Sequence, residues 1–162
     1  MDFSNQSRVW IYLSNRDFTE AEVSKLNQQI QQFCIQWTAH GTNLRAFGEV
    51  RHHRFIVLMV DETAAGASGC SIDKSIHFVQ EIEKEFGVHL FNRMLFAWKE
   101  REKIRVSNLE DLQKLFDNGL LTERSTVFNT TVTTKKDLDT HFETTLGQSW
   151  MMKRIRTTRS VT

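Results

Sequence analysis

A chain of 162 residues with 40% hydrophobic and 25% charged residues has the size and composition of a globular domain with a sizeable core. Its formal net charge of +1 gives no overall reason to expect nucleic acid or an anionic membrane as a partner. The N-terminus lacks the apolar segment of a signal peptide, no apolar run could span a bilayer, and the two cysteines are too few for a disulfide framework. We therefore expect a cytoplasmic protein.

The first forty residues predict a strand followed by a helix. Residues 9–13 form a short apolar run typical of a strand, and Thr19 with Glu22 forms a capping box that predicts a helix start. Apolar residues then recur at helical spacing as far as Trp37, and Gly41 is the expected stop signal.

The next sixty residues predict two strands, a second helix and a fourth strand. Residues 44–51 alternate between apolar and polar, which is typical of a half-exposed edge strand, whereas 54–61 contains an unbroken apolar run typical of a central strand. An apolar stripe at helical spacing extends over 72–86, and residues 94–98 again have a strand pattern.

This order of elements, strand–helix–strand–strand–helix–strand, is that of ferredoxin-like folds. The right-handed crossover rule places the third strand between the first two. We predict one α+β domain over 1–162, with a ferredoxin-like antiparallel core over 8–100 and a mainly helical extension over 101–162. Both sheet faces should be covered: one by the two helices, the other by the C-terminal region or by a second subunit in a homodimer.

The predicted topology brings distant residues to one edge of the sheet, because the first helix ends where the second begins. Trp37 and His40 should therefore lie near Asp61 and the segment 68–73. Cys70 falls at the predicted start of the second helix, where free N–H groups and the helix dipole favour a thiolate. His40 could then serve as a base, oriented by Asp61 or Asp73.

The same segment has two other interpretations. The free N–H groups could hold a phosphate or carboxylate, with Ser68 and Ser71 as additional donors. Alternatively, the segment is only a capped helix start, with Ser71 as the N-cap and Cys70 as a small apolar residue. The candidate catalytic residues are Cys70 and His40, and the candidate binding residues are Ser68, Gly69, Ser71, Asp73, Asp61 and Trp37.

Other polar groups carry weaker signals. His52 and His53 are adjacent, at the predicted turn between the second and third strands, and no Cys or His spacing resembles a zinc site. We therefore expect neither a metal nor a cofactor. The basic residues Lys153, Arg154, Arg156 and Arg159 near Trp150 could touch nucleic acid, but four charges are few, so we do not expect a nucleic-acid partner.

Four groups of residues form a recognisable pattern: Trp10-Ile11-Tyr12, Trp37 with His40-Gly41, Ser68-Gly69-Cys70-Ser71-Ile72-Asp73, and Ser149-Trp150. Together they resemble a family of small bacterial proteins without an established activity, whose members often carry the label ABC transporter ATPase. The resemblance covers nearly the whole chain and implies a bacterial, cytoplasmic protein. The phosphate-binding pattern GxxxxGK[ST] is missing from the sequence, so we exclude ATP hydrolysis.

Three functional hypotheses follow. The first is a non-catalytic binding or regulatory module for a small, anionic ligand at the edge that contains 68–73. The second is a thiol-dependent enzyme with Cys70 as nucleophile and His40 as base. The third is a structural or partner-binding protein without a ligand site. Whether the protein is an enzyme is left open by the sequence.

Overall fold

The computed structural model describes residues 2–157, which form two compact units of mixed α and β structure. The predicted α+β class is therefore confirmed. The first unit comprises the described residues up to Asn92 together with Thr130–Thr140. The second comprises Arg93–Asn129 and the described residues from His141 onward.

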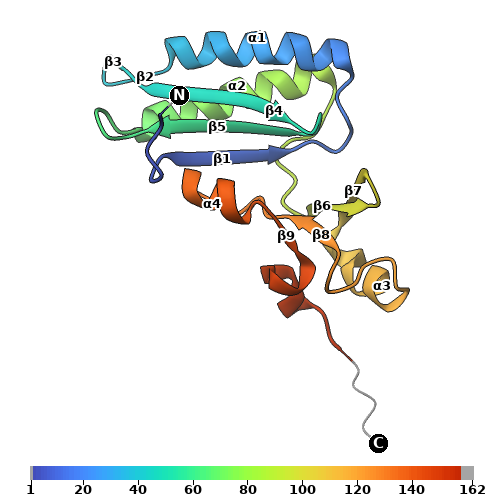
Figure 1. Cartoon of the computed structure of the whole chain (residues 1–162). Helices are drawn as coiled ribbons and strands as arrows, with labels where there is room; N and C mark the ends of the chain where they lie inside the picture. The colour runs from blue at the N-terminus through green and yellow to red at the C-terminus, as the bar shows by residue number, and fades with distance from the viewer. Residues whose placement is uncertain (1, 158–162) are drawn as a thin grey trace, which may run out of the picture. The chain divides into compact units, whose positions relative to one another are not determined.

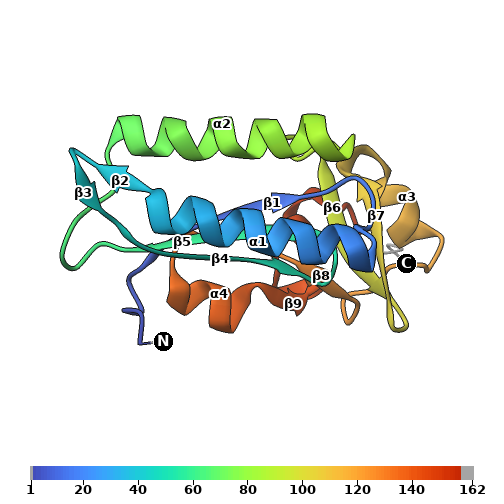
Figure 2. The same cartoon turned by 90° about the horizontal axis from the view of Figure 1, so that it is seen from above.

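The first unit is built on a three-stranded antiparallel sheet in the order β1-β5-β4. The third predicted strand thus lies between the first two, as the crossover rule requires. Figures 1 and 2 show α1 and α2 side by side on one face of this sheet. The elements of this unit are β1 (Arg8–Leu13), α1 (Glu20–Gln36), β2 (Thr38–Ala39), β3 (Thr42–Asn43), β4 (Arg45–Arg51), β5 (Phe55–Asp61), α2 (Gly69–Phe86) and, at its end, α4 (Lys135–His141).

The boundaries of the two long helices follow from their caps. The capping box of Thr19 and Glu22 is present at the start of α1, and Gly87 ends α2 with a φ of 63°. The stop predicted at Gly41 is too late, because α1 ends at Gln36 and Trp37 is extended. The chain leaves the helix early to form the β2–β3 hairpin, whose turn contains His40 and Gly41.

Side chains of β5 alternate between the two faces of the sheet, and all of them are buried. Ile56, Leu58 and Val60 belong to the core beneath α1 and α2, together with Leu26 and Ile30 of α1. Phe55, Val57 and Met59 therefore point to the opposite face. A strand that is apolar on both faces needs cover on both, as the sequence indicated.

Residues 130–140 cover that second face. Figure 1 shows α4 on the side of the sheet opposite α1 and α2. Before the helix, the chain joins the outer edge of β1, where the Val9 amide donates to the Thr133 carbonyl at 2.9 Å and the Lys135 amide donates to the Ser7 carbonyl at 2.8 Å. Val132 and Leu138 are buried. The C-terminal region thus supplies the cover, and a homodimer through this face is not needed for it.

The predicted fourth strand is correct as a strand, but its place in a ferredoxin-like sheet is wrong. Residues 95–100 form β6, which pairs with β7 and β8 in the second unit. The edge of β1 that β6 would occupy is taken by residues 133–135. The second unit contains β6 (Leu95–Glu100), β7 (Lys103–Asn108), α3 (Leu112–Asp117), β8 (Thr126–Phe128), β9 (Glu143–Thr145) and a 3₁₀ turn at Trp150–Arg154.

The predicted helical extension also needs correction, because the second unit is built on a four-stranded sheet in the order β7-β6-β8-β9. Ile104 and Val106 alternate with polar residues along β7, which is a strand pattern that the sequence interpretation passed over. Arg101 permits the tight turn between β6 and β7 by adopting a left-handed conformation with a φ of 57°.

Gly48 determines how closely α1 approaches the sheet. A Cβ atom at this position in β4 would lie 2.4 Å from Cγ2 of Ile30 and 2.9 Å from Cδ2 of Leu58. Both neighbours are buried, so neither can move aside freely.

We expect Gly48→Ala to lower the free energy of unfolding by about 1–3 kcal/mol, the usual cost of overpacking a core. Urea denaturation followed by circular dichroism measures this change. Gly69→Ala is the matched control, because a Cβ at Gly69 meets nothing within 4 Å, and its effect should stay within about 0.5 kcal/mol. Equal stability of the Gly48 variant and the wild type would contradict this packing.

Candidate functional site

The end of α1 and the start of α2 are adjacent, as the topology predicted. The buried indole Nε1 of Trp37 donates a hydrogen bond of 2.8 Å to the carbonyl of Ser71. Lys74 Nζ lies 3.4 Å from Oγ1 of Thr38, just after the helix. Two segments that are more than thirty residues apart in sequence therefore form one edge.

The serines of the predicted anion site form a capping box. The Ser68 hydroxyl accepts from the Ser71 amide at 3.2 Å, while the Ser71 hydroxyl accepts from the Ser68 amide at 2.7 Å and donates to the Ser68 carbonyl at 2.8 Å. The N-cap is Ser68 rather than Ser71, and Gly69 is the first helical residue. Both hydroxyls are thus engaged within the helix start.

The predicted catalytic residues lie near this edge without contacting one another. Cys70 is exposed in the first turn of α2, and His40 is exposed in the β2–β3 turn with a φ of 51°. Across the described residues, no hydrogen bond or ion pair joins Cys70 to His40 or to the exposed Asp73. The geometry of a nucleophile bonded to its base is therefore not formed.

Asp61 was predicted to orient His40, but in the structure its carboxylate has a structural role instead. Its carboxylate accepts from the Ser4 amide at 3.0 Å, from the Thr63 amide at 3.0 Å and from the Thr63 hydroxyl at 2.7 Å, and Arg45 lies 3.3 Å away. The hydrogen bond from Ser4 is the largest cause that lowers the pKa of Asp61. This buried carboxylate therefore anchors the N-terminal segment and the turn after β5.

The two cysteines occupy opposite environments. Cys34 lies on the core side of α1, and burial raises the pKa of its thiol to about 12. Its thiolate is therefore scarce at neutral pH, whereas Cys70 is open to solvent.

We expect iodoacetamide at pH 8 to modify Cys70 alone in the folded protein, with Cys34 reacting only after denaturation. Intact-protein mass spectrometry should show one adduct on the wild type and none on Cys70→Ser. Alkylation of Cys34 in the native state at a rate similar to that of Cys70 would contradict the assigned burial.

A surface groove of about 420 Å³ runs between α1 and α2, and the sequence interpretation did not identify it. Figure 2 shows these two helices side by side. Each helix contributes residues at positions i, i+3, i+4 and i+7, which lie on one helical face. The lining consists of Gln29, Gln32, Phe33 and Gln36 from α1, and of Phe78, Glu81, Ile82 and Glu85 from α2.

The groove has an aromatic floor. Phe33 and Phe78 stack across it with ring centroids 4.3 Å apart and an interplanar angle of 6°. Phe33 also packs against Trp37 at 5.0 Å, and Trp37 packs against Trp10 of β1 at 5.7 Å. The rings therefore continue from the groove down to the sheet. Stacked aromatic pairs of this kind hold both helices in a fixed position.

The edges of the groove carry carboxylates and amides, but none of its lining residues is cationic. Gln29 donates from Nε2 to both carboxylate oxygens of Glu85, at 3.2 and 2.9 Å, while its Oε1 is buried and has no hydrogen-bond partner. Lys25 lies 3.5 Å from Glu85, and Lys84 lies 3.7 Å from Glu81. These are exposed ion pairs, which neutralise the carboxylates only in part.

The end of the groove opposite Trp37 is held by Arg16. Its guanidinium binds both carboxylate oxygens of Glu22, at 2.8 and 2.9 Å, and donates to the Phe86 carbonyl at the end of α2 at 2.5 Å. The hydrogen bond from Arg16 is the largest cause that lowers the pKa of Glu22 to about 2. Both ends of α2 are therefore tied to the segments that flank α1, and the groove is largely preformed.

Two sequence signals indicate the groove in retrospect. The 19 residues from Leu26 to Leu44 contain no Asp, Glu, Lys or Arg, although 25% of the chain is charged. Along α1, the row Gln29, Phe33 and Gln36 runs beside the core stripe. Phe33 belongs to the apolar residues that recur along α1, but it is only partly buried.

The remaining candidates do not form a site. His52 and His53 occupy the β4–β5 turn with φ values of 53° and 57°. Within the described ranges, no three His, Cys, Asp or Glu side chains are grouped so that they could hold a metal ion. Lys153, Arg154 and Arg156 are exposed, while Arg159 lies outside the described residues.

Comparisons with protein-family models, with curated proteins and with solved structures find no match to this chain. Over residues 2–157, no helix has both the length and the apolar character needed to cross a membrane.

Proposed function

We propose that the chain is a non-catalytic binding module, that its site is the groove between α1 and α2, and that its ligand combines a flat apolar group with a positive charge. The single observation that supports this proposal most strongly is the stacked pair Phe33–Phe78 beneath an edge that carries Glu81 and Glu85.

The chemistry of the lining defines the ligand. Phe33 and Phe78 each use one ring face for their mutual stacking, so they offer a ligand the remaining apolar surface that lines the groove. Carboxylates attract cations and hydrogen-bond donors. The amide oxygens of Gln32 and Gln36 add acceptors. A volume of about 420 Å³ is in the range of small-molecule sites, roughly 300–1,000 Å³.

This proposal replaces the anionic ligand expected from the sequence with a cationic one at a different place. Two of the donors that an anion at the start of α2 would use are already engaged: the Ser71 hydroxyl donates to the Ser68 carbonyl, and the Ser71 amide donates to the Ser68 hydroxyl. Cys70 and His40 make no contact that would support an enzyme. The groove, in contrast, combines the volume of a small-molecule site with aromatic and acidic side chains.

Two small probes with the same ring and opposite charge test the proposal. We expect tryptamine to shift backbone amide resonances of 29–36 and 78–85 in ¹⁵N-labelled protein, with a dissociation constant of roughly 1 mM, as its small size implies. Indole-3-acetate should bind much more weakly, because its carboxylate would face Glu81 and Glu85.

The double variant Glu81→Gln/Glu85→Gln should weaken tryptamine binding about threefold or more, while Glu110→Gln, an exposed change in the second unit, should leave it unaltered. Equal binding of both probes would contradict the proposed charge preference. Shifts confined to 68–73 would contradict the proposed location and favour the predicted edge.

A further inference from the structure

The segment Trp150–Arg156 displays an aromatic ring beside three positive charges. Met151 and Ile155 are buried in the core of the second unit, whereas Trp150 is 36% exposed. Lys153, Arg154 and Arg156 are exposed as well. The apolar anchors therefore hold the segment in place while its aromatic and basic side chains face solvent.

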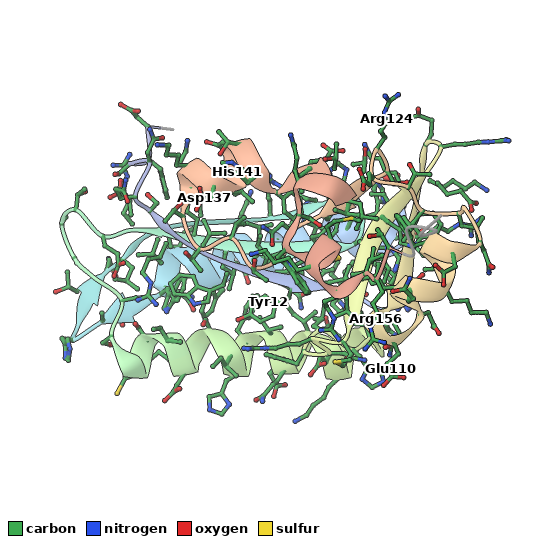
Figure 3. The ribbon with its side chains drawn as sticks, turned by 90° about the horizontal axis from the view of Figure 1, so that it is seen from below. Tyr12, Glu110, Arg124, Asp137, His141 and Arg156 are labelled. Carbon is green, nitrogen blue, oxygen red and sulfur yellow. The ribbon has the colours of Figure 1, made fainter. Side chains whose placement is uncertain are left out.

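The segment is fixed in position at both ends. At its start, the Ser149 hydroxyl accepts from the Met151 amide at 3.2 Å and caps the 3₁₀ turn. At its end, the side chain of Gln113 accepts from the Arg156 amide at 2.7 Å and donates to the Arg156 carbonyl at 3.0 Å. Figure 3 labels Arg156 at this point. Trp150 and Lys153 are three residues apart, which places them on one side of a 3₁₀ turn.

These side chains match the ligand that the groove requires. Trp150 supplies the flat apolar ring, and Lys153 and Arg154 supply the positive charge for Glu81 and Glu85. Tryptophan and arginine are also the residues that most often dominate binding at protein interfaces. We infer, on the basis of the proposed function, that the ligand of the groove is the Trp150–Arg156 segment of a second copy of this chain.

The surface around the groove is suited to contact with a second copy of the chain. Gln28, Gln31 and Ile35 are exposed on α1 within the stretch that lacks Asp, Glu, Lys and Arg, and Ile35 is 76% exposed. Depletion of charge is typical of the central part of an interface. The formal net charge of +1 means that two copies do not repel one another strongly.

The contact joins two different surfaces, so it is heterologous and runs head to tail. Such contacts either close into a ring or continue into an open chain of copies. Because one groove and one short segment bury little area, the association should be weak, dependent on protein concentration and reduced by salt.

Charge reversal tests this inference by sedimentation velocity of the full chain. The wild type should associate as its concentration rises. Glu81→Lys/Glu85→Lys and Lys153→Glu/Arg154→Glu should each raise the dissociation constant at least about tenfold, because like charges then face each other. A 1:1 mixture of the two variants should associate again, because each groove then meets a segment of opposite charge. Glu110→Lys is the control and should behave as the wild type.

Two outcomes would overturn the inference: a wild type that stays monomeric at all concentrations, or reversal variants that associate as the wild type does. Tryptamine titration separates this failure from failure of the proposed function, because Lys153→Glu/Arg154→Glu leaves the groove intact. If tryptamine binds while the chain remains monomeric, the groove is a site for another molecule and the self-association is wrong.

Discussion

Two hydrogen bonds to backbone carbonyls of α2 determine the position of this helix beside α1 in the first unit. The Trp37 indole donates to Ser71 in the first turn of α2, and the Arg16 guanidinium donates to Phe86 at its end. Leaving a buried N–H such as that of Trp37 without an acceptor costs about 1–3 kcal/mol, which makes this position strongly preferred. Arg16 also satisfies a terminal carbonyl and places positive charge at the negative end of the helix dipole.

The groove is a consequence of this arrangement. The two helices are antiparallel, and Phe33 of α1 stacks on Phe78 of α2. Gly48 brings α1 close to β4, since any larger residue would push Ile30 outward. The lining of the groove is therefore set by contacts at its ends and beneath it, and its polar edges remain available for a ligand.

Local patterns predicted much of the first unit. The capping box at Thr19, the central position of β5 and the adjacency of Trp37 to 68–73 all follow from local sequence patterns and the crossover rule. The pairing of strands was harder to predict from the sequence. An apolar strand such as β6 can complete any open edge, and nothing in its own residues shows that 133–135 occupy the edge of β1 instead.

The groove could not be predicted from the sequence either, because it also depends on how distant segments pack. Periodicity identifies the stripe of each helix that faces the core, but the groove is made by the neighbouring rows of two helices. Their register depends on Trp37 and Arg16, whose acceptors are backbone carbonyls without any sequence signature. The predicted edge, in contrast, was identified by side-chain type alone, and there the structure uses the serines as a helix cap.

Nuclear Overhauser effects between ring protons test the account most directly. In the free protein, the rings of Phe33 and Phe78 should show strong cross-peaks to each other, because their centroids are 4.3 Å apart. With tryptamine bound, both rings should also show cross-peaks to the indole protons. Absence of the Phe33–Phe78 cross-peaks, or indole contacts only to aromatic rings elsewhere in the chain, would contradict the account.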